Sequence, residues 1–68
     1  MRLSEFNERY EEILHSNAKQ AIKNKQLANL MTDMEYEFNI PALRDAEWEK
    51  ENKPIIELYR KISNSRKF

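Results

Sequence analysis

Residues 17–38 read NAKQAIKNKQLANLMTDMEYEF, and this stretch decides the fold. It holds no glycine or proline and is rich in residues of high helix propensity. Ser16 or Asn17 can cap its start, and Gln20 stands at capping-box distance from Asn17. Pro41 ends it, because the residue before a proline is pushed out of the α region. The sequence therefore predicts one long helix over 17–38.

The apolar residues of this helix fall on two opposite faces. One face carries five large side chains: Leu27, Leu30, Met31, Met34 and Phe38. The other carries Ala18, Ala21 and Ile22, about half a turn away on a helical wheel. The helix is either interrupted near residues 23–26 or packs its two halves on different partners. We favour a continuous helix, because KNKQ holds no strong helix breaker. The larger face is then expected to meet another chain.

Shorter helices are expected on both sides, at about 4–15 and 54–63. Each carries an apolar stripe at helical spacing, namely Leu3, Phe6, Tyr10, Ile13 and Leu14 in the first and Ile55, Leu58, Tyr59 and Ile62 in the second. Residues 39–53 show no clean stripe, which indicates a connector with a short helical turn. The predicted fold is all-α: a single domain over 1–68, built as a small three-helix bundle or helical array with one long central helix. Mid-stripe residues Tyr10, Ile13, Leu30 and Tyr59 should be largely buried.

Composition narrows the possible functions. The 68 residues include no glycine, valine or cysteine, which argues against hairpins, phosphate loops, thiol nucleophiles and cysteine-held metals. A domain of this size is marginally stable and has no disulfide to supplement its core, so burial against a partner is the expected supplement. No apolar run is long enough for a membrane span, and Met1–Ser4 begins no secretory signal. We expect a cytoplasmic, non-enzymatic protein without cofactor or small-molecule substrate. The richness in Asn, Lys and Ile suggests a bacterial or phage origin.

Charges occur in blocks although the net charge is zero. Residues 16–32 hold three lysines and no acid, whereas residues 33–51 hold seven acids against two bases. Residues 52–68 hold five bases against one acid. The plain interpretation is a set of solvated helix faces. The sharper one is that acidic and basic blocks meet, within the chain or between copies, and fix an orientation.

Two groups of polar residues could form a binding site. Glu12 and His15 have the spacing of one half of a bundle metal site, but a single copy is insufficient, and a histidine at a helix end is the simpler account. The acid-free stretch 16–29 offers Lys19, Lys23, Asn24 and Lys25, residue types that contact phosphates and base edges. The positive electrostatic potential of this stretch is modest, because it holds three lysines and no arginine.

The sequence thus favours a small, non-catalytic helical module that associates with itself as a homodimer or binds a protein partner. The expected interface residues are Leu27, Met31, Met34, Phe38 and Trp48, the last because aromatic residues are enriched in interface cores. The alternative is a small nucleic-acid-binding regulator that uses the basic stretch 16–29.

Overall fold

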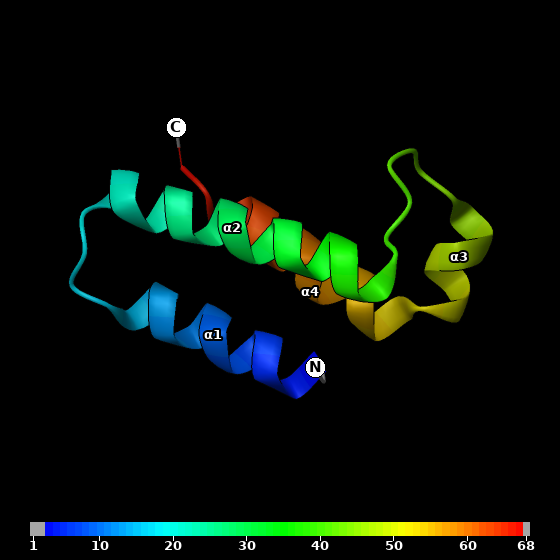
Figure 1. Cartoon of the computed structure of the whole chain (residues 1–68), viewed down its shortest axis with the longest axis horizontal. Helices are drawn as coiled ribbons and strands as arrows, with labels where there is room; N and C mark the ends of the chain where they lie inside the picture. Colours follow the sequence, from blue (N-terminus) through cyan, green and yellow to red (C-terminus); the bar gives the residue numbers. More distant parts are fainter. Residues whose placement is uncertain (1–2, 68) are drawn as a thin grey trace.

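The computed structural model describes residues 3–67 and is all-α, as predicted. Within this range the helices are α1 (Leu3–His15), α2 (Gln20–Phe38), α3 (Ala46–Glu51) and α4 (Lys53–Ser65). α2 runs antiparallel to both α1 and α4, and all three contact one another (Figure 1). The connector and α3 extend from the end of this bundle, where α3 contacts α4.

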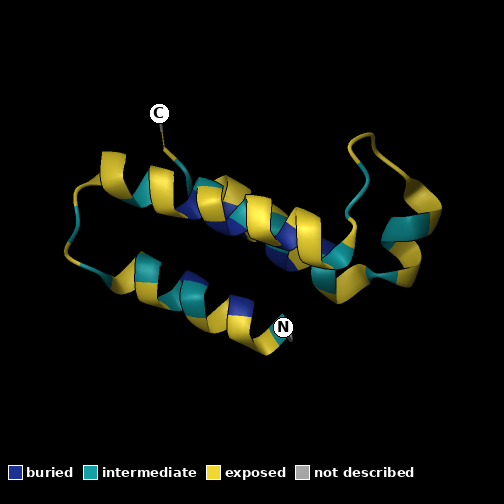
Figure 2. Ribbon diagram, in the orientation of Figure 1, coloured by how far each residue is buried: buried dark blue, intermediate teal, exposed yellow. Residues whose placement is uncertain are grey.

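The core lies between the three longer helices, on the sides that face one another (Figure 2). Its buried members are Phe6, Tyr10, Leu27, Leu30, Met34, Leu58 and Ile62. Tyr10 and Leu30 are buried as expected, whereas Ile13 and Tyr59 are only partly buried and pack against the rim of the core. The largest stripe of α2 therefore packs within the chain itself.

α2 is continuous through residues 23–26 but begins at Gln20 rather than at residue 17. The Ser16 hydroxyl donates to the Ile13 carbonyl at 2.9 Å, so it closes α1 and does not cap α2. Lys19 occupies the N-cap position in an extended conformation without a side-chain cap. The expected capping box at Asn17 is therefore not formed.

The end of α2 is closed by Asn39, which has φ 53° and ψ 46°. Left-handed backbone at this position favours glycine, and asparagine is the usual substitute. The Asn39 and Ile40 amides both donate to the Glu35 carbonyl. A chain without glycine thus still makes a sharp exit into the connector.

The connector 40–45 leads to the two turns of α3, which was expected as a short helical turn. The Asp45 carboxylate caps α3 by accepting from the Trp48 amide at 3.1 Å. Asn52 stands at the junction and donates its side-chain amide to the Trp48 carbonyl at 2.9 Å. α4 follows at once, with Pro54 in its first turn, where a missing amide hydrogen costs nothing.

Candidate protein-interaction surfaces

The expected interface on α2 is mostly inside the molecule. Leu27 and Met34 are buried in the core of the single chain and cannot meet a partner. Met31 and Phe38 are partly buried and packed against the same core, where the Phe38 ring lies 5.3 Å from the Phe6 ring. The assignment of this face to another chain is therefore wrong. α1 and α4 cover the larger stripe, because it holds most of the apolar surface of α2.

The opposite side of α2 is the side left open. Its exposed residues lie within an arc of about 100° on a helical wheel; we call them the outer face, and they are Ala21, Ile22, Lys25, Asn29, Thr32 and Tyr36. Ile22 is 50 % exposed and Tyr36 is 86 % exposed. No described part of the chain covers these two side chains. The smaller apolar face of this helix, which the sequence pattern defines by Ala18, Ala21 and Ile22, is thus the uncovered one, and Tyr36 extends it.

A hollow opens beside Tyr36 on this outer face. It has a volume of about 460 Å³ and is lined by Phe6, Thr32, Asp33, Tyr36 and Glu37. Arg9 borders it from α1, pairing with Asp33 at 2.9 Å and holding its guanidinium 5.6 Å from the centre of the Phe6 ring. The hollow therefore combines one exposed aromatic side chain, Tyr36, with a charged edge, and the fully buried Phe6 lies beneath it.

A second hollow lies where the connector and α3 meet α4. It has a volume of about 320 Å³, and its apolar lining includes Ile40, Leu43, Trp48, Ile56 and Tyr59. Leu43 is 84 % exposed, whereas Trp48 is half-buried. Trp48 is thus the one expected interface residue that borders an open groove outside the core.

Charged residues at this groove are already paired. Glu49 accepts from Arg60 and lies 3.7 Å from the Arg44 guanidinium. Tyr59 donates its hydroxyl to Glu35, which joins α4 to α2. Burial, followed by that hydrogen bond and the charge of Glu35, raises the pKa of Tyr59 to about 12. The phenol therefore stays protonated at neutral pH and serves as a hydrogen-bond donor.

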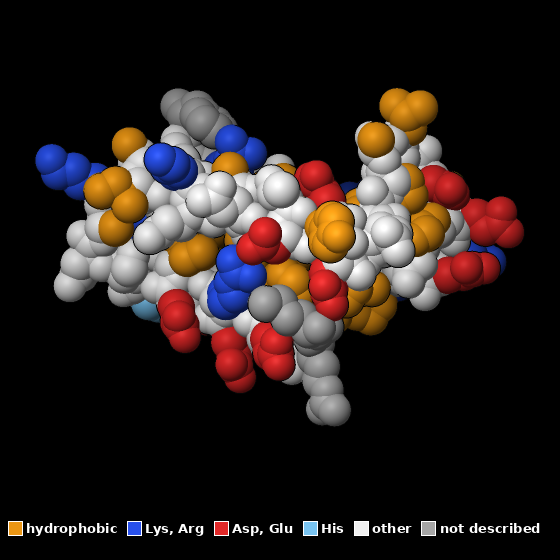
Figure 3. Space-filling view, viewed as in Figure 1, with side chains coloured by type: hydrophobic (Ala, Val, Ile, Leu, Met, Phe, Trp, Pro, Cys, Tyr) orange, Lys and Arg blue, Asp and Glu red, His pale blue; other side chains and the backbone are white. Residues whose placement is uncertain are grey.

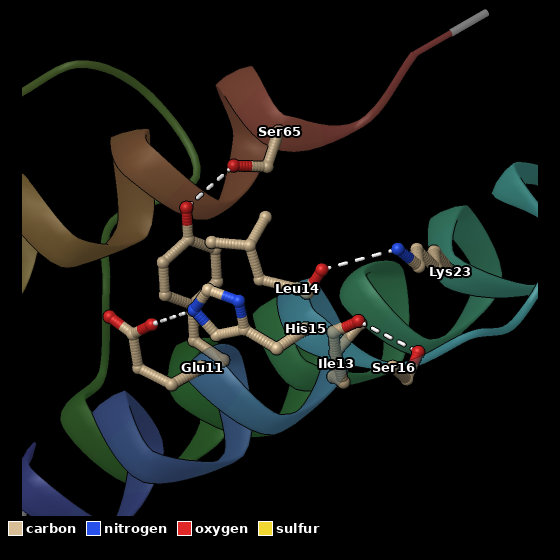
Figure 4. A network of polar contacts seen from close by, with 8 residues as sticks. Glu11, Ile13, Leu14, His15, Ser16, Lys23 and Ser65 are labelled. Atoms are coloured by element: carbon tan, nitrogen blue, oxygen red, sulfur yellow. Dashed lines mark hydrogen bonds and ion pairs between the residues drawn. The ribbon is translucent and has the colours of Figure 1, made fainter.

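The basic stretch lies where α2 starts, and the end of α4 adds to it. Lys19 and Lys25 are exposed, but Lys23 is partly buried and donates to the Leu14 carbonyl at 3.2 Å (Figure 4). The side chain of Asn24 is occupied as well, since it bonds both the amide and the carbonyl of Lys67. In Figure 3 basic side chains stand near the start of α2, while acids lie along α1 and around α3.

His15 lies at the end of α1 with its Nε2 atom 3.1 Å from a Glu11 carboxylate oxygen (Figure 4). This is a pairing within one helix face, and Glu12 takes no part in it. Among residues 3–67, no three His, Cys, Asp or Glu side chains lie together in a way that could hold a metal ion.

Comparison with protein-family models, curated proteins and solved structures finds no match to this chain. Among residues 3–67, none of the helices has the length and apolar character needed to cross a bilayer. The expectation about a secretory signal rested partly on Met1 and Arg2, which lie outside the described residues.

Proposed function

We propose that this chain is a small, non-catalytic protein-interaction module that binds a helix of a partner protein on the outer face of α2. One observation carries the proposal: a helix face with the 86 % exposed Tyr36 beside a hollow, uncovered by the rest of residues 3–67. Single exposed apolar residues are ordinary, but one that borders a hollow can anchor a partner side chain. The proposal includes a cytoplasmic location, for which the support comes from the sequence alone.

The shape of this hollow favours a helix as the bound element. Four residues of its lining come from two consecutive turns of α2 and surround the space between two ridges of side chains: Thr32, Asp33, Tyr36 and Glu37. Such a space accepts a side chain from a second helix when the two helices pack ridge into groove. The exposed threonine and asparagine on the outer face are short enough to permit that approach.

Site-specific photocrosslinking tests the proposal in cells that naturally produce the chain. A benzophenone amino acid replaces Tyr36 in one variant and the exposed Glu57 of α4 in the matched control. We expect a discrete protein adduct from position 36 and none of the same mass from position 57. An absence of adducts at position 36, or identical adducts from both positions, would contradict the proposed function.

Nucleic-acid binding is the second candidate, favoured by one observation. The Lys67 backbone is bonded to Asn24, so the basic end of the chain lies against the basic start of α2. Against it, Lys23 and Asn24 are engaged within the chain and the net charge is zero. Binding of a random DNA duplex at low salt, weakening steeply with added salt and lost in Lys19→Gln/Lys25→Gln, would favour this candidate. The folded stability of that variant should match the parent, because exposed charges contribute little.

A further inference from the structure

We propose that the partner helix is α2 of a second copy, and that two outer faces pair antiparallel about a two-fold axis near Asn29. In this arrangement Ile22 of each copy enters the hollow beside the partner's Tyr36. The inference rests on the proposed function and names its partner. Two-fold pairing uses the same patch on both copies, so each contact occurs twice.

The spacing of the two anchors fits this symmetry. Ile22 and Tyr36 lie about four helical turns apart, or about 21 Å along the helix axis. They differ by only about 40° around it, so both project from the same side. Asn29 stands midway between them, on the same exposed face. A two-fold axis at Asn29 therefore places each Ile22 opposite the partner's Tyr36.

The charges of α2 select the antiparallel direction. On or beside the outer face, the first half of the helix carries Lys25 and no acid, whereas the second half carries Asp33 and Glu37. Antiparallel pairing brings the basic half of each copy to the acidic half of the other. Parallel pairing would oppose Lys25 to Lys25 and Asp33 to Asp33, which disfavours association. The helix is thus complementary to itself in one direction only.

Individual charges agree with the same register. Lys25 is exposed and would lie at the same height along the helix axis as the partner's Asp33. Asp33 already holds Arg9 of its own chain at 2.9 Å, on the border of the hollow. The incoming lysine would therefore join an existing ion pair next to the seated Ile22. Added salt should weaken the dimer, because these charges lie near solvent.

Sedimentation equilibrium at micromolar concentration tests the dimer directly. We expect the parent to approach about twice the 8.3 kDa chain mass. Ile22→Ser and Tyr36→Ser should each raise the dissociation constant about tenfold or more, because each removes an anchor at two symmetric places. Leu43→Ser is the matched control: it removes an equally exposed apolar side chain from the connector and should leave the dimer intact. Circular dichroism verifies that all variants fold.

A charge exchange tests the antiparallel register. Lys25→Glu and Asp33→Lys should each yield a weakened homodimer, since each opposes like charges at two symmetric places. When the two variants are mixed, each contact between residue 25 and residue 33 again joins opposite charges, and the mixture should recover the mass of the parent dimer. Parallel pairing predicts no weakening of either single variant, because identical positions would face each other and like charges would be opposed both before and after each change.

The outcomes separate this inference from the proposed function. A parent that stays monomeric throughout the micromolar range overturns the homodimer, whereas a Leu43→Ser variant that dissociates as readily as Tyr36→Ser overturns the assignment of the interface to the outer face. In either case an adduct from position 36 to a different protein would still support the proposed function. A dimer that survives Ile22→Ser and Tyr36→Ser unchanged overturns the assignment to the outer face.

Discussion

The hydroxyl of Tyr10 lies 2.7 Å from the hydroxyl of Ser65, joining the middle of α1 to the last turn of α4 (Figure 4). The Tyr10 ring is buried in the core, so its hydroxyl is held at the edge of the apolar region. Ser65 in turn donates to the Lys61 carbonyl at 3.0 Å, which leaves its oxygen free to accept from Tyr10. The first and last helices of the bundle are thus linked by a polar contact as well as by packing.

Removing this link should lower stability by a modest amount. Tyr10→Phe keeps the buried ring and deletes the hydroxyl, so we expect the free energy of unfolding to fall by about 1 kcal/mol. Chemical denaturation followed by circular dichroism measures the change. Ser65→Ala should have a similar effect, and the double variant should be little worse than either single one. Losses that simply add would show that the two hydroxyls do not interact.

Leu30 provides the sharpest test of the core. Its side chain is 0 % exposed, so Leu30→Ala leaves a cavity and should cost about 2–5 kcal/mol, enough to unfold much of a domain this small. Thermal denaturation provides the measurement. The control is Leu43→Ala, which truncates the same side chain where it is 84 % exposed and should melt close to the parent. If the Leu30 variant melted as the control does, the orientation of α2 would be wrong.

Asn39 should tolerate glycine but not alanine. Its φ of 53° puts Cβ of a non-glycine residue in a crowded position, at a cost of about 1 kcal/mol that glycine avoids. Asn39→Gly should therefore leave stability unchanged or raise it, whereas Asn39→Ala should lower it. Melting temperatures of the three proteins decide the matter. Equal melting temperatures for the alanine and glycine variants would argue against a left-handed helix end.

The Tyr59–Glu35 bond predicts a loss of stability at alkaline pH. Folding raises the pKa of Tyr59 from 10.0 to about 12, so the folded protein binds this proton more tightly than the unfolded chain does. The resulting stabilisation is complete below pH 10 and is lost as the pH rises toward 12. Urea denaturation across this range should show a steeper decline for the parent than for Tyr59→Phe. Identical slopes would contradict a protonated phenol that donates to Glu35.

Much of the fold was accessible to sequence reasoning because local patterns determine it. The stripe from Leu27 to Phe38 is long and strongly apolar, so it identified both the helix and its densest face. The start of α2 was misplaced because Ser16 and Asn17 have the right residue types for a cap. In the structure the Ser16 hydroxyl donates to the backbone carbonyl of Ile13 instead. The sequence pattern does not indicate this bond.

The candidate surface was harder to predict, for a different reason. A helical wheel shows that two apolar faces lie opposite each other but not which of them the neighbouring helices will cover. The wheel could have shown that Tyr36 lies near Ile22, opposite the larger stripe. The hollow beside it also needs Phe6 from α1, and the connector groove needs Ile56 from α4. Such spaces depend on the path of the whole chain and follow from no single segment.

The two ends of α2 are built differently, and this asymmetry should govern how the helix opens. Its first turn follows Lys19, which provides no side-chain cap. Its last turn is closed by the backbone amides of Asn39 and Ile40, which both donate to the Glu35 carbonyl. Fraying should therefore proceed from Gln20 inward. Amide hydrogens near Gln20 should exchange with deuterium soon after transfer, while those around Met34 should wait for global unfolding. Protection from exchange would then rise along α2 from its basic half to its acidic half.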